Sequence, residues 1–414
     1  RQVRDVIQSL EATRGFPAEA AEKSGALEAA EGAPVARLVN LLITQAIRDR
    51  ASDIHIEPRK DVVQVRYRID GVLHDTIRVP QHLQSALVTR VKILAGMNIA
   101  ERRLPQDGRI EIRREGRQID LRVATFPMVR GEKIVMRILD RGGVRLGLGE
   151  LGFEPEMLEA FEKVLTRPHG MILTTGPTGC GKTTTLYAAL DSINSPEKNI
   201  VTIEDPVEYD IDMVNQSQIN PKAGLTFATG LPALFRLDPD IIMIGEIRDL
   251  ESAQIGVQAA LTGHLVFSSL HTNDAPGAAT RLIDMGIEPY LVASTLLCAV
   301  SQRLVRLLCP GCKKPYQPSP FENEALGLDP AEETTFYNAR GCKQCNDTGF
   351  RGRQGIFEMM VPDEEIRPLI SSKAPTTLIR RRAIESGMVT LRPVSYTHLR
   401  AHETSLHLVC RLLL

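Results

Sequence analysis

A stretch near the middle of the chain, GPTGCGKTTT (residues 176–185), has the residue types and the spacing needed to hold phosphate groups. It contains the pattern G-x-x-x-x-G-K-T, between a short apolar run that predicts a strand (171–175) and a segment with helical apolar spacing. In that context the loop N–H groups and the helix N-terminus attract phosphate, the lysine reaches the β- and γ-phosphates, and the next threonine ligates Mg²⁺. The predicted nucleotide-binding residues are Gly176, Pro177, Thr178, Gly179, Cys180, Gly181, Lys182, Thr183 and Thr184.

Carboxylates are predicted to follow two strands of the same sheet. Glu204 and Asp205 end the apolar run in TIEDPVEY, and Glu246 ends the run in DPDIIMIGEIRD. Phosphoryl transfer needs a magnesium ion and a residue that orients the attacking water. We therefore predict that Glu246 activates water, that Glu204 is a second catalytic carboxylate, and that Thr183, Asp205 and Glu246 form a magnesium site. The alternative is that these acids only cap strand ends and helix starts.

Two histidines are predicted at opposite ends of one strand, in TGHLVFSSLHTND. His271 ends the strand on the side where the phosphates are expected, so we predict that it senses the γ-phosphate. His264 begins the strand, and a structural and a functional role stay equally open for it.

The cysteines suggest a metal site. Four of the seven form the pairs CPGC and CKQC, which predicts a structural tetrahedral zinc site at Cys309, Cys312, Cys342 and Cys345. The alternative is a set of reduced cysteines without a metal. Cys298 is expected to be a buried apolar residue. Paired clustering of this kind favours a reducing, cytoplasmic location over disulfides.

A parallel sheet is expected to position these side chains. The apolar runs in NIVTIED, DIIMIGE and HLVFSSLH alternate with helical segments, and such strands form parallel sheets that bind ligands at their carboxyl ends. The fold class is therefore α/β, preceded by a mixed α+β domain. The elements predicted for that first domain are a helix (34–50), a hairpin around Asp70-Gly71 (62–79), a second hairpin (109–126) and a strand (133–139).

The expected segments follow one another along the chain. They are an N-terminal linker remnant (1–33), the α+β domain (34–140), a glycine-rich hinge (141–153), the α/β domain (154–392) with a cysteine insert at about 305–352, and a tail (393–414). The tail, PVSYTHLRAHETSLHLVCRLLL, has neither helical nor strand periodicity. It is similar to translated sequencing-adapter read-through, which we prefer to a histidine-rich metal-binding tail. We therefore expect that the natural C-terminus lies outside this sequence. The chain begins without methionine, and its natural start is expected upstream.

Composition limits the classes of protein. With a net charge of −1, 4% aromatic residues and no tryptophan, the chain lacks the basic surface and stacking side chains of a nucleic-acid motor. Its longest apolar candidate, residues 290–300, is too short for a membrane helix. A scaffold that binds ATP without turnover is a further alternative, and the presence of Lys182 and Glu246 argues against it.

These motifs together resemble the secretion ATPase superfamily and, within it, the type II secretion system ATPases. Further stretches carry the resemblance, which runs from about residue 33 to about residue 392: ASDIHIEP, VRYRIDGVLH, AERRLPQDGRI and NPKAGLTF. The resemblance implies a RecA-like P-loop core with a smaller α+β N-terminal domain and a zinc-binding insert, using ATP, Mg²⁺ and Zn²⁺. It also implies a homohexamer at the cytoplasmic face of the inner membrane, held there by platform and anchoring proteins, without nucleic acid. Its implied function is to power pseudopilus assembly and protein export, and type IV pilus assembly is the alternative.

The resemblance also implies roles for arginines. In this superfamily, arginines of the first domain reach nucleotide on the second, and Arg122 in IDLRVAT and Arg137 in VMRIL match them. Without the resemblance, both would be assigned to a solvated strand face. One stretch departs from the family pattern, because GLPALFRLDPD has Pro232 and Leu237 where an arginine and a glutamine are usual, while Arg236 is kept. A proline near a helix start is tolerated by the backbone. The substitution nevertheless removes one basic side chain, so we expect the loss of one basic contact.

Overall fold

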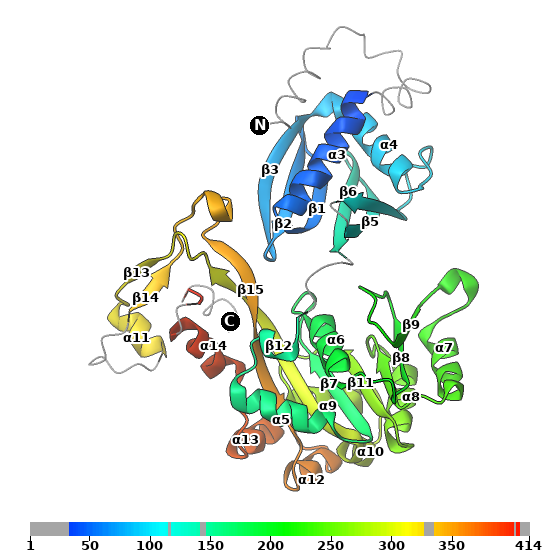
Figure 1. Cartoon of the computed structure of the whole chain (residues 1–414), viewed down its shortest axis with the longest axis vertical. Coiled ribbons are helices and arrows are strands. Elements are labelled where there is room, and N and C mark those ends of the chain that lie inside the picture. The colour runs from blue at the N-terminus through cyan, green and yellow to red at the C-terminus, as the bar shows by residue number, and fades with distance from the viewer. Residues whose placement is uncertain (1–32, 115–116, 141–145, 327–334, 401–402, 406–414) are drawn as a thin grey trace. The chain divides into compact units, whose positions relative to one another are not determined.

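The structure is a computed structural model, and it describes residues 33–114, 117–140, 146–326, 335–400 and 403–405 (Figure 1). The chain divides into two compact units, residues 1–143 and 144–414. Apart from Ala33, the predicted linker (1–33) lies outside the described residues, as do residues 141–145 of the predicted hinge. Over the described ranges, no helix is both long enough and apolar enough to cross a bilayer.

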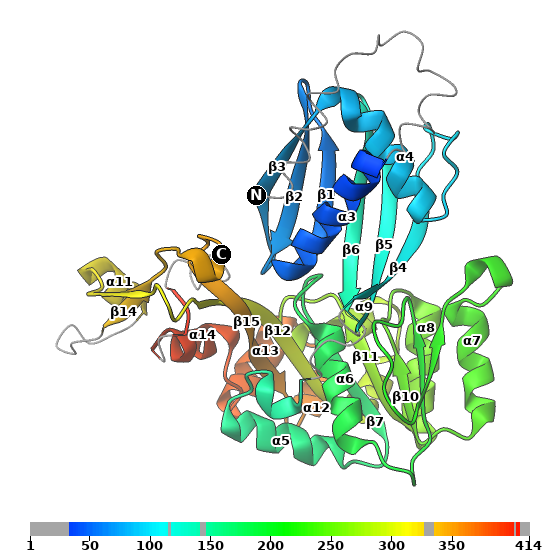
Figure 2. The same cartoon turned by 45° about the horizontal axis from the view of Figure 1, so that its top comes forward.

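Unit 1 is an antiparallel sheet with two helices on one face (Figure 2). Its strands follow the order β3-β2-β1-β6-β5-β4, and each neighbouring pair is antiparallel. Apolar side chains of the helices and of one sheet face form its core, and charged side chains occupy much of the other face. The elements are α3 (Ala33–Arg48), β1 (Ala51–Pro58), β2 (Val62–Ile69), β3 (Val72–Pro80), α4 (Gln84–Leu94), β4 (Gln106–Arg114), β5 (Arg117–Met128) and β6 (Gly131–Asp140).

Turn chemistry explains the first hairpin of unit 1. Asp70 and Gly71 have φ values of 47° and 84°, the left-handed pair that a tight hairpin turn requires and that Asp-Gly adopts readily. β2 and β3 pair on either side of it, with Ile69 opposite Val72. The predicted hairpin is confirmed, as are the second hairpin (β4 and β5), the strand β6 and the helix α3.

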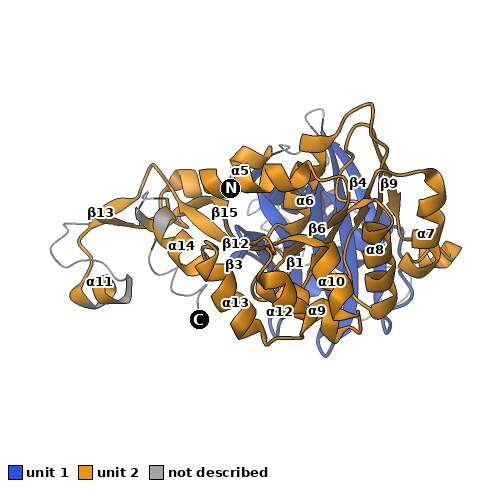
Figure 3. Ribbon diagram, turned by 90° about the horizontal axis from the view of Figure 1, so that it is seen from below, with its two compact units in different colours: residues 1–143 blue, residues 144–414 orange. Residues whose placement is uncertain are grey.

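Unit 2, orange in Figure 3, is built on a seven-stranded sheet in the order β15-β12-β7-β11-β10-β8-β9. All neighbouring strands run parallel except β15, which pairs antiparallel with β12 at the edge. Every residue of β7, β8, β10 and β11 is buried, which explains their continuous apolar runs and confirms the predicted parallel sheet. The strands are β7 (Gly170–Thr175), β8 (Ile200–Glu204), β9 (Val214–Gln218), β10 (Ile241–Ile244), β11 (Leu265–Leu270), β12 (Leu296–Leu308) and β15 (Phe350–Met360).

Helices cover both faces of this sheet. One face packs against α5 (Pro155–Leu165) and α6 (Lys182–Ile193). Proline at the first helical position starts α5, where its missing N–H costs nothing. The opposite face packs against α7 (Phe227–Leu234), α8 (Leu250–Leu261), α9 (Pro276–Asp284), α10 (Pro289–Thr295), α12 (Ile366–Ser371) and α13 (Thr376–Glu385).

Two short strands and a helix form the cysteine-containing insert: β13 (Lys314–Tyr316), α11 (Pro320–Leu326) and β14 (Phe336–Asn338). Beyond it, α14 (Leu391–Arg400) runs into the tail. The interpretation that this tail has no helical periodicity is therefore wrong for residues 393–400. Leu391, Val394 and Leu399 recur at helical spacing and are buried. Val394 packs with Val305 of β12 and Ile356 of β15, at the edge of the sheet. The origin assigned to the tail stays a prediction.

The position of Pro232 corrects another expectation. Thr226 caps α7, because its side-chain oxygen accepts the Thr229 N–H at 3.2 Å, so the helix has already begun when the chain reaches Pro232. Pro232 therefore lies inside the helix and not near its start. Having no N–H, it cannot bond the carbonyl one turn earlier. The helix soon passes into a 3₁₀ turn (Phe235–Leu237), and the chain leaves it at Asp238 with a φ of 52°.

Candidate functional site

The glycine loop joins the carboxyl end of β7 to the N-terminus of α6. Gly176, Gly179 and Gly181 have φ values of 141°, 79° and 93°, which L-residues with a Cβ rarely adopt. A Cβ on Gly176 would lie 2.7 Å from both the Cys180 sulfur and the Gln302 carbonyl oxygen. The loop backbone thus needs glycine, and it brings the positive end of the α6 dipole to the edge of the sheet.

Lys182 extends across this loop. Its ammonium donates to the carbonyl oxygens of Gly176 at 2.9 Å and Pro177 at 3.2 Å. Burial lowers the pKa of Lys182, the charge of Arg303 lowers it further, and the charge of Glu246 acts in the opposite direction. The end of β10, which carries Glu246, is therefore within electrostatic range of the loop lysine.

The predicted acid and histidine come together at the carboxyl ends of neighbouring strands. Glu246 follows β10 with 20% of its side chain exposed, pairs with Arg248, and lies 3.8 Å from Nε2 of His271, which follows β11. The hydrogen bond to Glu246 raises the pKa of Arg248, and the charge of Asp205 after β8 adds to this effect. Glu246, His271 and Asp205 thus share one edge of the sheet.

Glu204 has a different environment from Glu246. It is 2% exposed, and its carboxylate accepts hydrogen bonds from Tyr187, from Thr202 at 2.6 Å and from Gln216 at 3.2 Å. Burial raises the pKa of Glu204, and these three hydrogen bonds act in the opposite direction. The carboxylate joins α6, β8 and β9, a structural task that its sequence position did not indicate. Its catalytic role stays a prediction.

His264, for which both roles were open, has a structural environment. Its Nδ1 lies 3.0 Å from the carbonyl oxygen of Ala259 and 3.3 Å from the hydroxyl of Thr262, at the end of α8. Its ring also meets Phe235 edge-on, with 5.7 Å between ring centroids. These contacts favour a structural role for His264.

In unit 1, Arg122 and Arg137 stand opposite each other on β5 and β6. Arg109 is opposite Arg122, and Asp53 lies between Arg137 and Arg68, so this row of cross-strand partners shares one sheet face. Asp53 accepts from Arg137 at 3.1 Å and pairs with Arg68 at 3.2 Å, yet the Arg137 side chain is still 63% exposed. The two predicted arginines are therefore neighbours within a row rich in positive charge.

The four predicted cysteines form one cluster. All four sulfur atoms lie within 4.8 Å of one another. Three of the sulfur–sulfur distances are 3.9 Å (Cys309–Cys342), 3.8 Å (Cys312–Cys345) and 3.7 Å (Cys342–Cys345). A tetrahedral site with Zn–S bonds of about 2.3 Å has sulfur atoms about 3.8 Å apart, so the cluster fits that metal. Cys298, which is not part of this cluster, was expected to be a buried apolar residue, and it is fully buried in the sheet core.

Sequence reasoning missed two residues of β12. Gln302 is 1% exposed, and its amide donates to the carbonyl of Cys180 at 2.8 Å. A guanidinium nitrogen of Arg303 would lie 3.2 Å from a Cβ on Gly176, which places this charge beside the glycine loop. The available signal was a polar Ser-Gln-Arg run inside a mostly apolar strand, AVSQRLV.

Comparison with known proteins gives a consistent family. The family described as type II/IV secretion system protein matches residues 28–411. Type II secretion system ATPase E of Vibrio cholerae is 48% identical over 385 residues, which are 93% of this chain and 76% of that protein. Type IV pilus assembly ATPase PilB of Myxococcus xanthus is 50% identical over 371 residues, covering 88% of this chain and 65% of that protein.

A solved structure shares the fold. The X-ray structure of the ATPase DotB of Legionella pneumophila has a TM-score of 0.67, covering 91% of this chain and 95% of that one at 19% identity. The family match also continues past residue 392, into the segment expected to be foreign. The chain therefore belongs to the type II/IV secretion system protein family, as a secretion ATPase.

Proposed function

We propose that this secretion ATPase hydrolyses ATP to power pseudopilus assembly and protein export by type II secretion. The observation that carries the hydrolytic part is the shared sheet edge at which the glycine loop follows β7 and Glu246, after β10, lies 3.8 Å from His271, after β11. Phosphoryl transfer depends on such positioned charges. The similarity to the Vibrio cholerae protein over 93% of this chain supports the type II assignment.

The site residues have separate roles in this proposal. The glycine loop, residues 176–184, binds the phosphates, and Lys182 exchanges its two carbonyl acceptors for phosphate oxygens. Thr183, Asp205 and Glu246 bind Mg²⁺, directly or through water. Glu246 orients the attacking water, and His271, at 3.8 Å from it, senses the γ-phosphate.

We further propose that Arg122 and Arg137 act on nucleotide held by unit 2, after domain closure or across a subunit boundary. Their row of positive charge, part of it exposed, suits the negative charge that develops during phosphoryl transfer. A homohexamer would supply such boundaries. The assembly would sit at the cytoplasmic face of the inner membrane through platform and anchoring proteins, without nucleic acid.

The second candidate function is type IV pilus assembly, favoured by the 50% identity to PilB of Myxococcus xanthus. An exchange experiment separates the two. The aligned region of the Vibrio cholerae ATPase is replaced by this chain, and secretion is measured in a strain that lacks its own ATPase. We expect secretion to be restored, and to be lost again with Glu246→Gln. Restored pilus assembly in the matching Myxococcus exchange, without restored secretion, would assign the chain to pili.

Zinc at the cysteine cluster is expected to support the fold of the insert and not the chemistry. Purified protein should contain about one zinc ion per chain, since four thiolates leave no open position on the metal. Removing it should unfold the insert, because ligation and folding are coupled in such small sites, while the KM for ATP stays unchanged.

Metal analysis and thiol titration before and after chelation measure this. Cys345→Ser should lose the metal, and Cys298→Ala, which changes a buried core thiol, should keep it. A zinc-free chain that is fully folded with all four cluster thiols reactive would contradict the proposal.

A further inference from the structure

The loop between β11 and α9, residues 271–275, is attached to the strands around the glycine loop. It begins with His271. Two residues later, the carbonyl oxygen of Asn273 accepts from the Arg303 guanidinium at 3.0 Å and from the Ser301 hydroxyl at 3.4 Å. Both donors belong to β12, and Arg303 is the residue beside Gly176. The first half of the loop is therefore fixed on the phosphate side.

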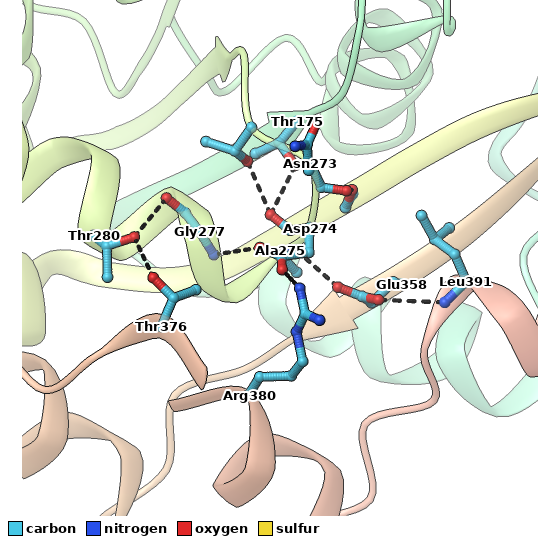
Figure 4. Close-up of polar contacts among 12 residues, drawn as sticks. Thr175, Asn273, Asp274, Ala275, Gly277, Thr280, Glu358, Thr376, Arg380 and Leu391 are labelled. Carbon is cyan, nitrogen blue, oxygen red and sulfur yellow. Dashed lines mark hydrogen bonds and ion pairs between the residues drawn. The ribbon is translucent and has the colours of Figure 1, made fainter. Parts of the chain in front are cut away.

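Asp274 links this loop to the C-terminal helices (Figure 4). Its carbonyl oxygen accepts from Thr272 at 2.9 Å and from Thr175, the last residue of β7, at 3.5 Å. Its carboxylate accepts the Gly277 N–H at 2.8 Å, at the start of α9, and pairs with Arg380 of α13. One residue thus joins the strand before the glycine loop to a helix near the end of the chain.

Glu358 of β15 fixes the far end of the same loop. It is 3% exposed, and its two oxygens accept the N–H of Ala275 at 2.8 Å and the N–H of Leu391 at 3.2 Å (Figure 4). Burial raises its pKa, and the two N–H groups and the charge of Arg303 oppose that rise. The carboxylate therefore holds the end of the loop to the segment that follows α13.

A hydroxyl contact joins α9 to α13 near the ion pair between Asp274 and Arg380. The Thr376 hydroxyl at the start of α13 donates to the Thr280 hydroxyl of α9 at 3.0 Å. Ile379 and Ala383 on α13 are buried in the same core as Leu282 of α9. A displacement of α13 would therefore reach the loop both through α9 and through Arg380.

We infer that Arg380 is a positioning residue for ATP hydrolysis. Through Asp274 it fixes the loop that carries His271, and so the C-terminal helices set how His271 meets Glu246. This inference rests on the proposed roles of His271 and Glu246. Among the described residues, Arg380 pairs with Asp274 and forms no ion pair with His271 or Glu246. Its side chain is 46% exposed, so its ion pair contributes little to the free energy of unfolding.

Arg380→Ala is expected to lower kcat about tenfold, because small misplacements of a catalytic group are costly, and to leave the KM for ATP unchanged. Arg380→Lys should recover part of the rate. The matched control is Arg382→Ala on the same helix. In the described part of the chain, the ion pairs of Arg382 are with Glu365 and Glu385, and neither belongs to the loop that carries His271. That variant should turn over ATP like wild type, and both alanine variants should unfold at nearly the same temperature as wild type.

A double-mutant comparison tests the route through Asp274. Asp274→Asn should lower kcat to a similar extent, and adding Arg380→Ala should have little further effect, since both remove one interaction. The inference would be overturned if the effects of Asp274→Asn and Arg380→Ala on kcat multiply. It would also be overturned if Arg382→Ala lowers kcat as much as Arg380→Ala does, or if Arg380→Ala raises the KM for ATP.

His271→Ala separates this inference from the proposed function. If His271→Ala turns over ATP like wild type, the role of the histidine is wrong, and the coupling through Arg380 fails with it. If His271→Ala is impaired while Arg380→Ala is normal, only the coupling is wrong. Impairment of both, with an unchanged KM, supports the coupling.

Discussion

Glu246→Gln is expected to leave ATP binding nearly intact and to lower turnover by about 10²–10⁴-fold, the loss typical when general-base help is removed. Glutamine keeps the size and hydrogen bonding of the side chain but lacks the charge that would orient or deprotonate water. Nucleotide contacts are assigned to the glycine loop and Lys182, which the substitution does not touch, and Thr183 and Asp205 of the proposed magnesium site are kept. The measurement is kcat together with the Kd for ATP in the assembled oligomer, because Arg122 and Arg137 are proposed to act after domain closure or across a subunit boundary.

Lys182→Ala is the matched comparison, and it should weaken ATP binding as well as hydrolysis. The wild-type chain must first show turnover, because Pro232 lies inside α7, at a position where the resemblance led us to expect a basic residue. If Glu246→Gln hydrolyses ATP like wild type, the assignment to Glu246 is wrong. Glu204 would be next, although its carboxylate would have to give up hydrogen bonds from Tyr187, Thr202 and Gln216.

Arg122→Ala is expected to lower turnover by about 10³–10⁵-fold, the range for an arginine that neutralises transition-state charge in other nucleotide hydrolases. The Kd for ATP should change far less, because the arginine is proposed to act only after domain closure or across a subunit boundary. Arg137→Ala should behave in the same way, and Asp53, its partner at 3.1 Å, keeps a second ion pair with Arg68.

Arg113→Ala is the control, since Arg113 is an exposed arginine farther along β4, opposite Gln118. It should hydrolyse ATP like wild type. An equal loss of affinity and turnover in Arg122→Ala would assign that residue to ground-state nucleotide binding instead.

Much of the fold could be predicted because its signals are local. The Asp70-Gly71 turn sets the pairing of β2 with β3, and the buried apolar runs of β7, β8, β10 and β11 indicate a sheet covered on both faces. The C-x-x-C spacing likewise predicted a cluster whose sulfur atoms lie within 4.8 Å of one another. In each case, residues close in sequence carry the information.

Two local predictions were wrong because nearby sequence signals were overlooked. Pro232 was expected near a helix start, but the capping contact of Thr226 with Thr229 begins α7 earlier. The tail was interpreted as having no helical periodicity, but residues 393–400 belong to α14, in which Leu391, Val394 and Leu399 are buried at helical spacing.

By itself, the sequence determined the glycine loop, the carboxylates at the strand ends and the cysteine spacing, because each depends on a short run of residues. Only the tertiary structure decided which side chains meet across the sheet. It buried Glu204 against Tyr187 and Gln216, and it paired Asp274 with Arg380. These contacts join residues far apart in the chain, and strand order and helix packing bring them together, so no local pattern encodes them.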